Sequence, residues 1–293
     1  MTDRNGTTTY GYDNQGRLVS KAAPAGTLTH TYDAAGNRLT VASSNANGTS
    51  VGYSYDELSR LKAVTDNRLP AGLNTTIYTY DAVGNLNTIC LPNGVTVTPG
   101  LDTMNRVISL PVTSKPAAVY SYSYGAVGNR LTAADPKGSS TYTYDSVYRM
   151  TAESVARSPL NGTLNYGLDP VGNRLSLVST LSGINPQTVA YDANDRLTAN
   201  NFDANGNTLS ANGKTFGYDS LDRMTTVNSG AVTMVYDGDG SRVAKAAGGV
   251  ATSYLVDDNN PSGLAQVVEE IVGGVVQRTY THGRTGSLRP RAA

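Results

Sequence analysis

Short stretches of alternating aromatic and small polar residues recur along the chain, and each ends in a Tyr-Asp pair. Stretches such as YGYD, YSYD, IYTYD and TYTYD place tyrosines at i and i+2, on one face of a strand, with Gly, Ser or Thr on the other face. The aspartate then begins a turn, because its carboxylate can accept the backbone N–H two residues on. A turn residue, an arginine and an aliphatic residue follow and begin the returning strand. The pattern predicts a β-hairpin.

This hairpin motif is repeated along the chain. The first turn residue, called the anchor, is Asp13, Asp33, Asp56, Asp81, Asp102, Gly125, Asp145, Asp169, Asp192, Asp203, Asp219 or Asp237. The spacing is about 20 to 25 residues up to Asp192 and shorter afterwards. Twelve matches in phase indicate a repeat protein.

Two forms of the turn alternate. The arginine position follows the anchor by four residues in one form and by five in the other, without exception along the chain. We interpret the long form as a one-residue insertion, which would turn the next side chains to the wrong face unless a bulge compensates. A glycine in the left-handed region is the natural bulge residue, so we expect positive φ at Gly36, Gly84, Gly128, Gly172 and Gly206.

The predicted fold class is all-β. Gly, Asn, Thr, Ser and Tyr dominate, and no stretch sustains a 3.6-residue period for three turns. Tandem antiparallel β-hairpins would form a curved or spiralling β-strip, a partial hollow shell. A β-propeller, with four strands from each pair of repeats, is the alternative architecture. We expect a repeat strip over 1–250, terminal hairpins over 251–283 and a basic, disordered tail over 284–293.

The residues expected to carry the repeat are its tyrosines, anchors, turn glycines and arginines. They are Tyr12, Asp13, Arg17, Tyr32, Asp33, Gly36, Arg38, Tyr55, Asp56, Arg60, Tyr80, Asp81, Gly84, Gly128, Arg130, Tyr144, Asp145, Arg149, Asp169, Gly172, Arg174, Tyr191, Asp192, Arg196, Tyr218, Asp219, Arg223, Tyr236, Asp237 and Arg242.

Composition and charge exclude several partners. Lys plus Arg and Asp plus Glu are 23 each, so no net field draws the chain to nucleic acid or an anionic membrane. The single cysteine, Cys90, cannot form an internal disulfide. No apolar stretch approaches the ~20 residues of a membrane span, and we expect no export signal in the start MTDRNGTTTY.

The Y-D-x-x-G-[N]-R-L repeat resembles the RHS family, also called YD-repeat proteins, over roughly residues 10 to 283. The stretch SYLVDDNNPSGLAQVVEEIVGGVVQRTYTHG is similar to the segment that precedes the core region of that family. The resemblance implies a β-strip that spirals into a hollow shell. In bacterial toxins the shell encloses a C-terminal toxic domain, and in animal teneurins it is part of an adhesion receptor.

The chain also departs from that family. After Gly283 it runs into RTGSLRPRAA, where the family's self-cleaving core would follow, so we expect a truncated or fragmentary shell without its toxin domain. A strip of some 24 to 28 strands would be on the order of 120 Å long, about one circuit of a shell. Such a strip would leave open sheet edges, through which we expect self-association.

Two side-chain series have a structural and a functional interpretation. The tyrosines could form a saccharide-binding surface, but we favour cross-strand aromatic packing: Tyr10, Tyr12, Tyr53, Tyr55, Tyr78, Tyr80, Tyr122, Tyr124, Tyr142 and Tyr144. The arginines could form a polyanion track, but a nearby anchor aspartate favours pairing or stacking on tyrosine: Arg17, Arg38, Arg60, Arg106, Arg130, Arg149, Arg174, Arg196, Arg223 and Arg242.

Candidate chemistry is sparse. The Asp237-Gly-Asp239 start of a calcium-like loop fails at two critical positions, because Gly248 replaces the bidentate Glu and Arg242 the turn Gly, and the acidic run 257–260 is interpreted as a hairpin loop. His30 and His282 lie in strand-like stretches without a nucleophile motif. We therefore expect no enzyme activity, no cofactor and no metal.

The predicted function is a non-catalytic structural β-shell segment of an RHS-repeat protein, of the kind that encapsulates or presents a toxin domain. A cell-surface adhesin or carbohydrate-binding module, using the Tyr-rich face, is the alternative. The expected partners are the remainder of the shell or an enclosed toxin domain, and surface glycans under the alternative. We expect the protein to be secreted or at the cell surface as part of a larger bacterial protein.

Overall fold

The computed structural model describes residues 1–3, 5–114, 116–283 and 286–292; side chains are described up to residue 283. The described residues form only strands and turns, with antiparallel pairing throughout. The prediction of an all-β fold of tandem antiparallel hairpins is thereby confirmed. This part of the chain holds no helix of the length and apolarity that a membrane crossing requires.

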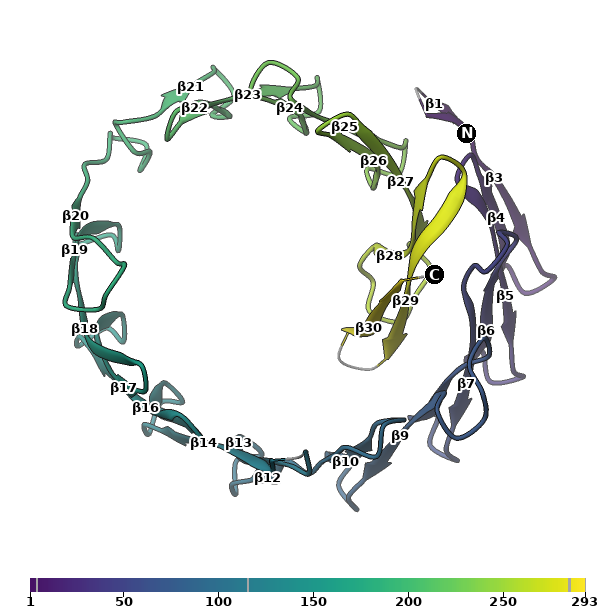
Figure 1. The fold of residues 1–293 in the computed structure, drawn as a ribbon, viewed down its shortest axis with the longest axis horizontal. Helices are drawn as coiled ribbons and strands as arrows, with labels where there is room; N and C mark the ends of the chain where they lie inside the picture. The colour runs from purple at the N-terminus through teal and green to yellow at the C-terminus, as the bar shows by residue number, and fades with distance from the viewer. Residues whose placement is uncertain (4, 115, 284–285, 293) are drawn as a thin grey trace. The chain divides into compact units, whose positions relative to one another are not determined.

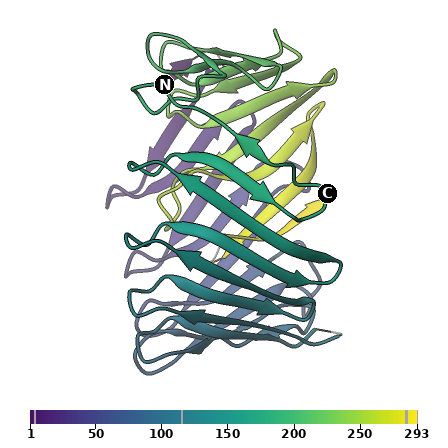
Figure 2. The same ribbon diagram turned by 90° about the vertical axis from the view of Figure 1, so that its left-hand side faces the viewer.

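The chain divides into two compact units. Unit 1 comprises Met1–Tyr78 and Asp203–Ala293, and unit 2 comprises Thr79–Phe202. Between Val107 and Thr188 in unit 2, each strand pairs with the next one along the chain, so that successive turns alternate between the two edges of the sheet (Figure 2).

The strands of unit 1 come from both ends of the chain (Figure 1). They are β1 Thr2–Asp3, β2 Gly6–Thr7, β3 Thr9–Tyr12, β4 Leu18–Ala23, β5 Gly26–Tyr32, β6 Arg38–Ser43, β7 Ser50–Tyr55, β8 Leu61–Asp66, β9 Thr75–Tyr80 (whose last two residues belong to unit 2), β22 Thr208–Ala211, β23 Lys214–Tyr218, β24 Met224–Val227, β25 Val232–Tyr236, β26 Arg242–Ala247, β27 Val250–Asp257, β28 Gln266–Val272, β29 Val275–Gly283 and β30 Gly286–Ala292.

The strands of unit 2 are contiguous in the sequence. They are β10 Leu86–Cys90, β11 Thr96–Val97, β12 Gly100–Leu101, β13 Val107–Val112, β14 Ala118–Tyr124, β15 Arg130–Asp135, β16 Gly138–Tyr144, β17 Met150–Arg157, β18 Leu160–Leu168, β19 Arg174–Ser179, β20 Gln187–Thr188 and β21 Asn201–Phe202.

Unit 1 has two layers where its C-terminal strands cover its N-terminal ones. Leu28, Val41, Val51 and Val64, on consecutive strands β5 to β8, are at most 2% exposed. Strands β28 and β29 lie beside these strands in Figure 1, and hydrogen bonds between β6–β8 with their loops and β28 and β29 join the two layers. Burial of one apolar face against a second layer is what gives such a sheet a core.

The basic tail differs from the prediction of disorder. Residues 284, 285 and 293 lie outside the described residues, and Gly286–Ala292 forms β30, which pairs with β29 from Arg278↔Ala292 to Gly283↔Gly286. The second edge of β29 carries backbone donors and acceptors that a further strand can satisfy. Terminal hairpins are thus present beyond residue 250, but they continue past residue 283.

The predicted positive φ is confirmed at the five turn glycines, where it lies between 89° and 104°. The predicted one-residue insertion in the long turns is wrong. In both forms the anchor N–H donates to the carbonyl four residues on, as Asp13 does to Arg17 and Asp33 to Asn37. Both forms also carry a bulge in the returning strand, where the register shifts at Tyr12↔Leu18 and at Tyr32↔Arg38. One turn geometry therefore serves the whole array.

Turn position 4, counting the anchor as position 1, has positive φ in all twelve repeats. Glycine occupies it in seven repeats, and the other five use Ser59, Asn105, Tyr148, Asp195 and Asp222, with φ between 57° and 64°. A left-handed backbone is unfavourable for bulky residues and tolerated by asparagine and aspartate. The turn geometry, not the residue type, therefore decides the conformation.

This geometry predicts opposite effects at two equivalent positions. Gly128→Ala should lower the free energy of unfolding by about 1 kcal/mol, because alanine is strained at positive φ. Tyr148→Asn should raise it by several tenths of a kcal/mol, because asparagine accepts this conformation more readily. Urea unfolding followed by circular dichroism measures both. A Gly128→Ala variant as stable as the original protein would contradict the assignment.

Candidate functional site

Eleven of the twelve repeats close their turn with the anchor carboxylate, and the sixth has Gly125 in its place. In the first repeat, Asp13 Oδ1 accepts the backbone N–H groups of Gln15 and Arg17, both at 2.9 Å, and Oδ2 accepts Arg17 Nε at 2.6 Å. The same arrangement recurs at Asp56, Asp102, Asp145, Asp192 and Asp219. At Asp13 the backbone N–H of Arg17, and then its side chain, lower the pKa of the carboxyl group.

The other form replaces the arginine at turn position 5 by asparagine. Asn37 Nδ2 donates to Asp33 Oδ2 at 2.9 Å, and equivalent bonds join Asn85 to Asp81, Asn173 to Asp169 and Asn207 to Asp203. In four repeats of this form an arginine stands at position 6, where the strand begins: Arg38, Arg130, Arg174 and Arg242. The two alternating forms thus share one turn geometry and differ in the side chains at positions 5 and 6.

The exchange has a structural consequence, because it links each repeat to the next. Arg17 Nη1 donates to the backbone carbonyl of Asp33, the next anchor, at 2.9 Å, and the guanidinium lies 4.8 Å from the ring centroid of Tyr32. Asn37 in turn donates to Ser59 Oγ, in the following turn, at 3.1 Å. Arginine therefore clamps an asparagine-type repeat, and asparagine contacts the repeat after it.

The tyrosine before the anchor makes a third link. Tyr32 Oη donates to the carbonyl of Leu18, at turn position 6 of the preceding repeat, at 2.6 Å. Tyr55, Tyr124, Tyr144, Tyr191, Tyr218 and Tyr236 do the same with the position 6 carbonyls of their preceding repeats. These hydroxyl groups therefore bond to the sheet itself.

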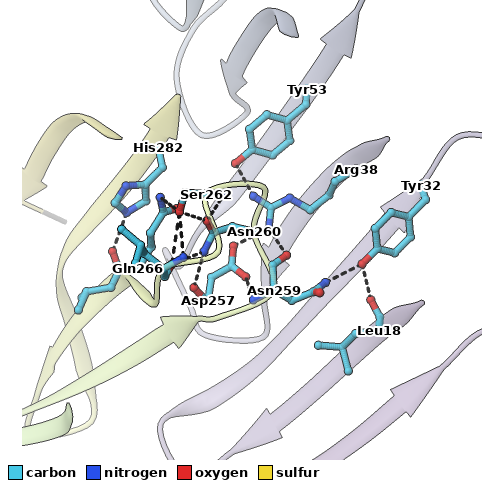
Figure 3. A network of polar contacts seen from close by, with 12 residues as sticks. Leu18, Tyr32, Arg38, Tyr53, Asp257, Asn259, Asn260, Ser262, Gln266 and His282 are labelled. Carbon is cyan, nitrogen blue, oxygen red and sulfur yellow. Dashed lines mark hydrogen bonds and ion pairs between the residues drawn. The ribbon is translucent and has the colours of Figure 1, made fainter. Parts of the chain in front are cut away.

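A second polar network lies in unit 1, where the loop after β27 meets β5–β7 (Figure 3). Asp257, 2% exposed, accepts a hydrogen bond from Arg38 Nη1 at 2.5 Å, and Arg38 Nη2 donates to Tyr53 Oη at 3.3 Å. Burial, with Arg38 opposing it, raises the pKa of Tyr53 to about 12. Asn259 Nδ2 donates to Tyr32 Oη at 2.7 Å. We call this contact region between β4–β8 and β25–β29 the closing interface.

Lys21 forms a second charged centre of the closing interface. It is 4% exposed, and its Nζ lies 2.6 Å from Asp258, 3.5 Å from Asp239 and 4.0 Å from Asp237. Burial, with the other aspartates, raises the pKa of Asp237, although Ser241 and Lys21 oppose the shift. The calcium-like run at Asp237 thus surrounds a lysine, and no group of described residues has the composition of a metal site.

Glu269 and Asp66 complete the closing interface. Glu269 is fully buried and accepts the backbone N–H of Thr49 at 2.6 Å and Asn45 Nδ2 at 2.7 Å. Arg68 forms a bidentate pair with Asp66, at 2.8 and 2.6 Å, and reaches Thr279 on β29. Carboxylates from the C-terminal strands therefore meet cations and N–H donors from the N-terminal ones.

His30 is buried among these groups without using all its hydrogen-bonding capacity. It is 3% exposed, and its Nδ1 has no partner. Burial lowers the pKa of His30, Asp257 and Asp258 oppose the shift, and Arg38 adds to it. His282, on β29, contacts the carbonyl of Val267 at 2.8 Å through Nε2. Neither histidine has a serine, threonine or cysteine among its recorded hydrogen-bond partners.

Sequence patterns found the repeat network but missed the closing interface. Lys21, His30 and Glu269 belong to no repeated motif, and their partners are more than 200 residues away. The acidic run 257–260 does form the expected loop, yet it also binds Arg38, which pattern reasoning assigned to a local pair. The one available signal was the pair of glutamates in the apolar run VVEEIV, which a strand buried on one face would not carry without partners.

Comparison with known proteins agrees with this geometry. The sequence profile of the Teneurin YD-shell family matches residues 2–166, more than half of the chain. The protein is therefore a YD-repeat shell protein by fold and by repeat, as the resemblance to the RHS family implied. The chain belongs to the Teneurin YD-shell family.

Two curated relatives come from Bacillus. The chain is 27% identical over 292 residues to the tRNA3(Ser)-specific nuclease WapA of Bacillus spizizenii, and 28% identical over 290 residues to the tRNA nuclease WapA of Bacillus subtilis strain 168. These alignments cover 98% and 97% of this chain but only 11% and 10% of the relatives. The chain spans about a tenth of their length.

Solved structures share the fold. The crystal structures of TcdB2-TccC3-TEV and TcdB2-TccC3 match 99% and 98% of this chain with TM-scores of 0.72 and 0.69, at 16% and 17% identity. A Photorhabdus luminescens Tc holotoxin pore matches 98% with a TM-score of 0.65 and 18% identity. This chain covers 16% to 20% of those chains. The fold is therefore that of the Tc toxin shell, and a propeller is not supported.

The closing interface predicts a large loss of stability when one buried charge is left alone. Arg38→Met leaves Asp257 buried and unpaired, which should lower the free energy of unfolding by about 3–5 kcal/mol. Arg149→Met, at a half-buried turn pair, is the matched control and should cost about 1 kcal/mol or less. Urea unfolding of both variants measures the difference, and equal losses would contradict the role given to the closing interface.

His30 predicts a dependence of stability on pH. Because its pKa is lowered in the folded state, the unfolded chain binds the proton more readily. The contribution is complete above the unfolded pKa of about 6.5 and is lost as pH falls through the folded pKa, at up to about 1.4 kcal/mol per pH unit. His30→Gln should remove this part of the slope between pH 7 and 5. A variant with the same slope as the original protein would disprove the assignment.

Proposed function

We propose that this chain is a wall segment of a YD-repeat shell that encloses or presents a toxin domain, and that the segment itself catalyses no reaction. The observation that carries the proposal is the repeat-to-repeat clamp. Anchor carboxylates, position 5 side chains and tyrosine hydroxyls bond to the backbone and to neighbouring repeats, as in the Asp13, Arg17 and Tyr32 network. An array built this way serves as a rigid wall.

The relatives support the toxin context. The curated relatives are named as tRNA nucleases, and the chain matches only about a tenth of each, so their nuclease activity can reside outside the matching region. The structural neighbours include a Tc holotoxin pore. We propose accordingly that the larger protein acts outside the cell that makes it, secreted or at the cell surface, with the remaining shell and a toxic domain as partners.

Protection of the toxic domain tests enclosure. The complete reading frame that contains this segment would be expressed and digested with trypsin, next to its C-terminal region expressed alone. Enclosure predicts that the C-terminal region is cleaved at least tenfold more slowly within the complete protein, and that single-particle images show density inside the wall. Equal cleavage rates in the two contexts would refute enclosure.

The non-catalytic assignment has a separate test. The purified 293-residue chain should leave bulk tRNA intact at protein concentrations where a nuclease degrades it, because neither histidine has a nucleophile among its recorded hydrogen-bond partners. His30→Gln and His282→Gln serve as matched variants. Cleavage by the original chain that either variant abolishes would show that the wall segment is itself an enzyme.

A further inference from the structure

Five consecutive turns of unit 2 expose an apolar side chain at the same place. Turn position 3 is Val83, Met104, Val127, Val147 and Val171, and these side chains are 56% to 79% exposed. All five turns join strands at the same edge of the sheet, because the intervening turns lie at the other edge. We call these five side chains the apolar row.

The turn geometry does not require this row. Position 3 is polar in other repeats, as Gln15, Asn205 and Asp239 show in turns closed by the same hydrogen bonds, although Leu58 and Leu221 in unit 1 are also apolar and exposed there. β-branched side chains are depleted in turns, where small and polar residues are preferred. Repeated exposed valines at this position therefore indicate an interaction surface.

The five turns of the row also carry no charged side chain at positions 2 to 4. Positions 2 to 4 of the five turns read AVG, TMN, AVG, SVY and PVG, and the arginines at position 5 are held by their anchors. The opposite edge of unit 2 carries Asp135, Lys137 and Arg157, with an ion pair between Arg157 and Asp135. The row is thus uncharged at its tips, whereas turns at the opposite edge carry charged side chains.

The spacing of the row identifies the partner. Two strands per repeat, at ~4.8 Å each, put successive side chains ~9.6 Å apart, and the five extend over ~38 Å. An apolar helix offers a seven-residue repeat of ~10.5 Å, which drifts by about 4 Å over four intervals. A second copy of the row has the same period and stays in register along its whole length.

We propose that two copies of this chain associate through the apolar row, related by a two-fold axis at Val127. Such an isologous contact places Val127 on Val127, Val83 on Val171 and Met104 on Val147, so every contact is apolar. The two sheets then meet edge to edge and extend the wall along the strand direction. This proposal does not depend on an enclosed toxin domain.

The area of this contact lies below that of stable interfaces. A row about 45 Å long on an edge about 10 Å thick covers roughly 450 Å² on each partner, or roughly 900 Å² in total. Stable interfaces bury about 1,200 Å² or more, and lattice contacts mostly less than about 800 Å². The dimer is therefore reversible and depends on protein concentration.

Sedimentation velocity over a range of concentrations tests the association. The original chain should shift from monomer to dimer as concentration rises, and Val127→Asp should weaken the dimer at least tenfold, because two carboxylates face each other at the axis. Asp239 occupies the same turn position, so aspartate is compatible with the turn. Leu221→Asp, at turn position 3 in unit 1 and 68% exposed, is the control and should leave the dimer unchanged.

Cross-linking tests the two-fold register. In a Cys90→Ser background, Val127→Cys should cross-link to itself with a short bismaleimide, whereas Val83→Cys should cross-link only when mixed with Val171→Cys. Three results would overturn the proposal: a chain that stays monomeric throughout, a dimer that Val127→Asp leaves intact, as pairing through open strand edges would, or a self-cross-link of Val83→Cys as strong as that of Val127→Cys.

Discussion

The structure depends on one carboxylate in eleven of its twelve repeat turns. The anchor aspartate accepts two backbone N–H groups with one oxygen and the position 5 side chain with the other, as Asp13 does with Gln15 and Arg17. A tight turn leaves these donors without partners in the sheet, and the carboxylate satisfies them locally. Each hairpin can therefore form in the same way, and the array grows by repetition.

Position 5 decides how repeats are joined. An arginine there reaches forward to the next anchor carbonyl and the next tyrosine ring, whereas an asparagine spans only to the following turn. Placing the arginine at position 6 instead moves its charge onto the returning strand, where Arg38 meets Asp257. The strict alternation therefore uses the position 5 side chains to link neighbouring turns and places the position 6 side chains on the returning strands of the sheet.

The two units use the same hairpins but bury them differently. In unit 1 the strands β27–β29 cover β4–β8, and charged residues are buried with the apolar ones. Such pairs add little net stability compared with apolar packing, but they penalise every misplaced register, because a single unmatched charge would stay buried. In unit 2, Val119 and Val178 on the strands are 54% exposed, as a single sheet layer leaves them. A shell wall with one open face has this character.

The sequence by itself determined the hairpin, its turn, the positive φ at residues such as Gly36 and the order of the repeats, because these depend on neighbours within about five positions. It misjudged the long turn, since residue counting cannot distinguish an insertion from an exchange of side chains at two positions. Only the tertiary structure decided the closing interface. Lys21, His30 and Glu269 gain their surroundings from strands more than 200 residues away, and burial and pairing over that separation leave no local pattern.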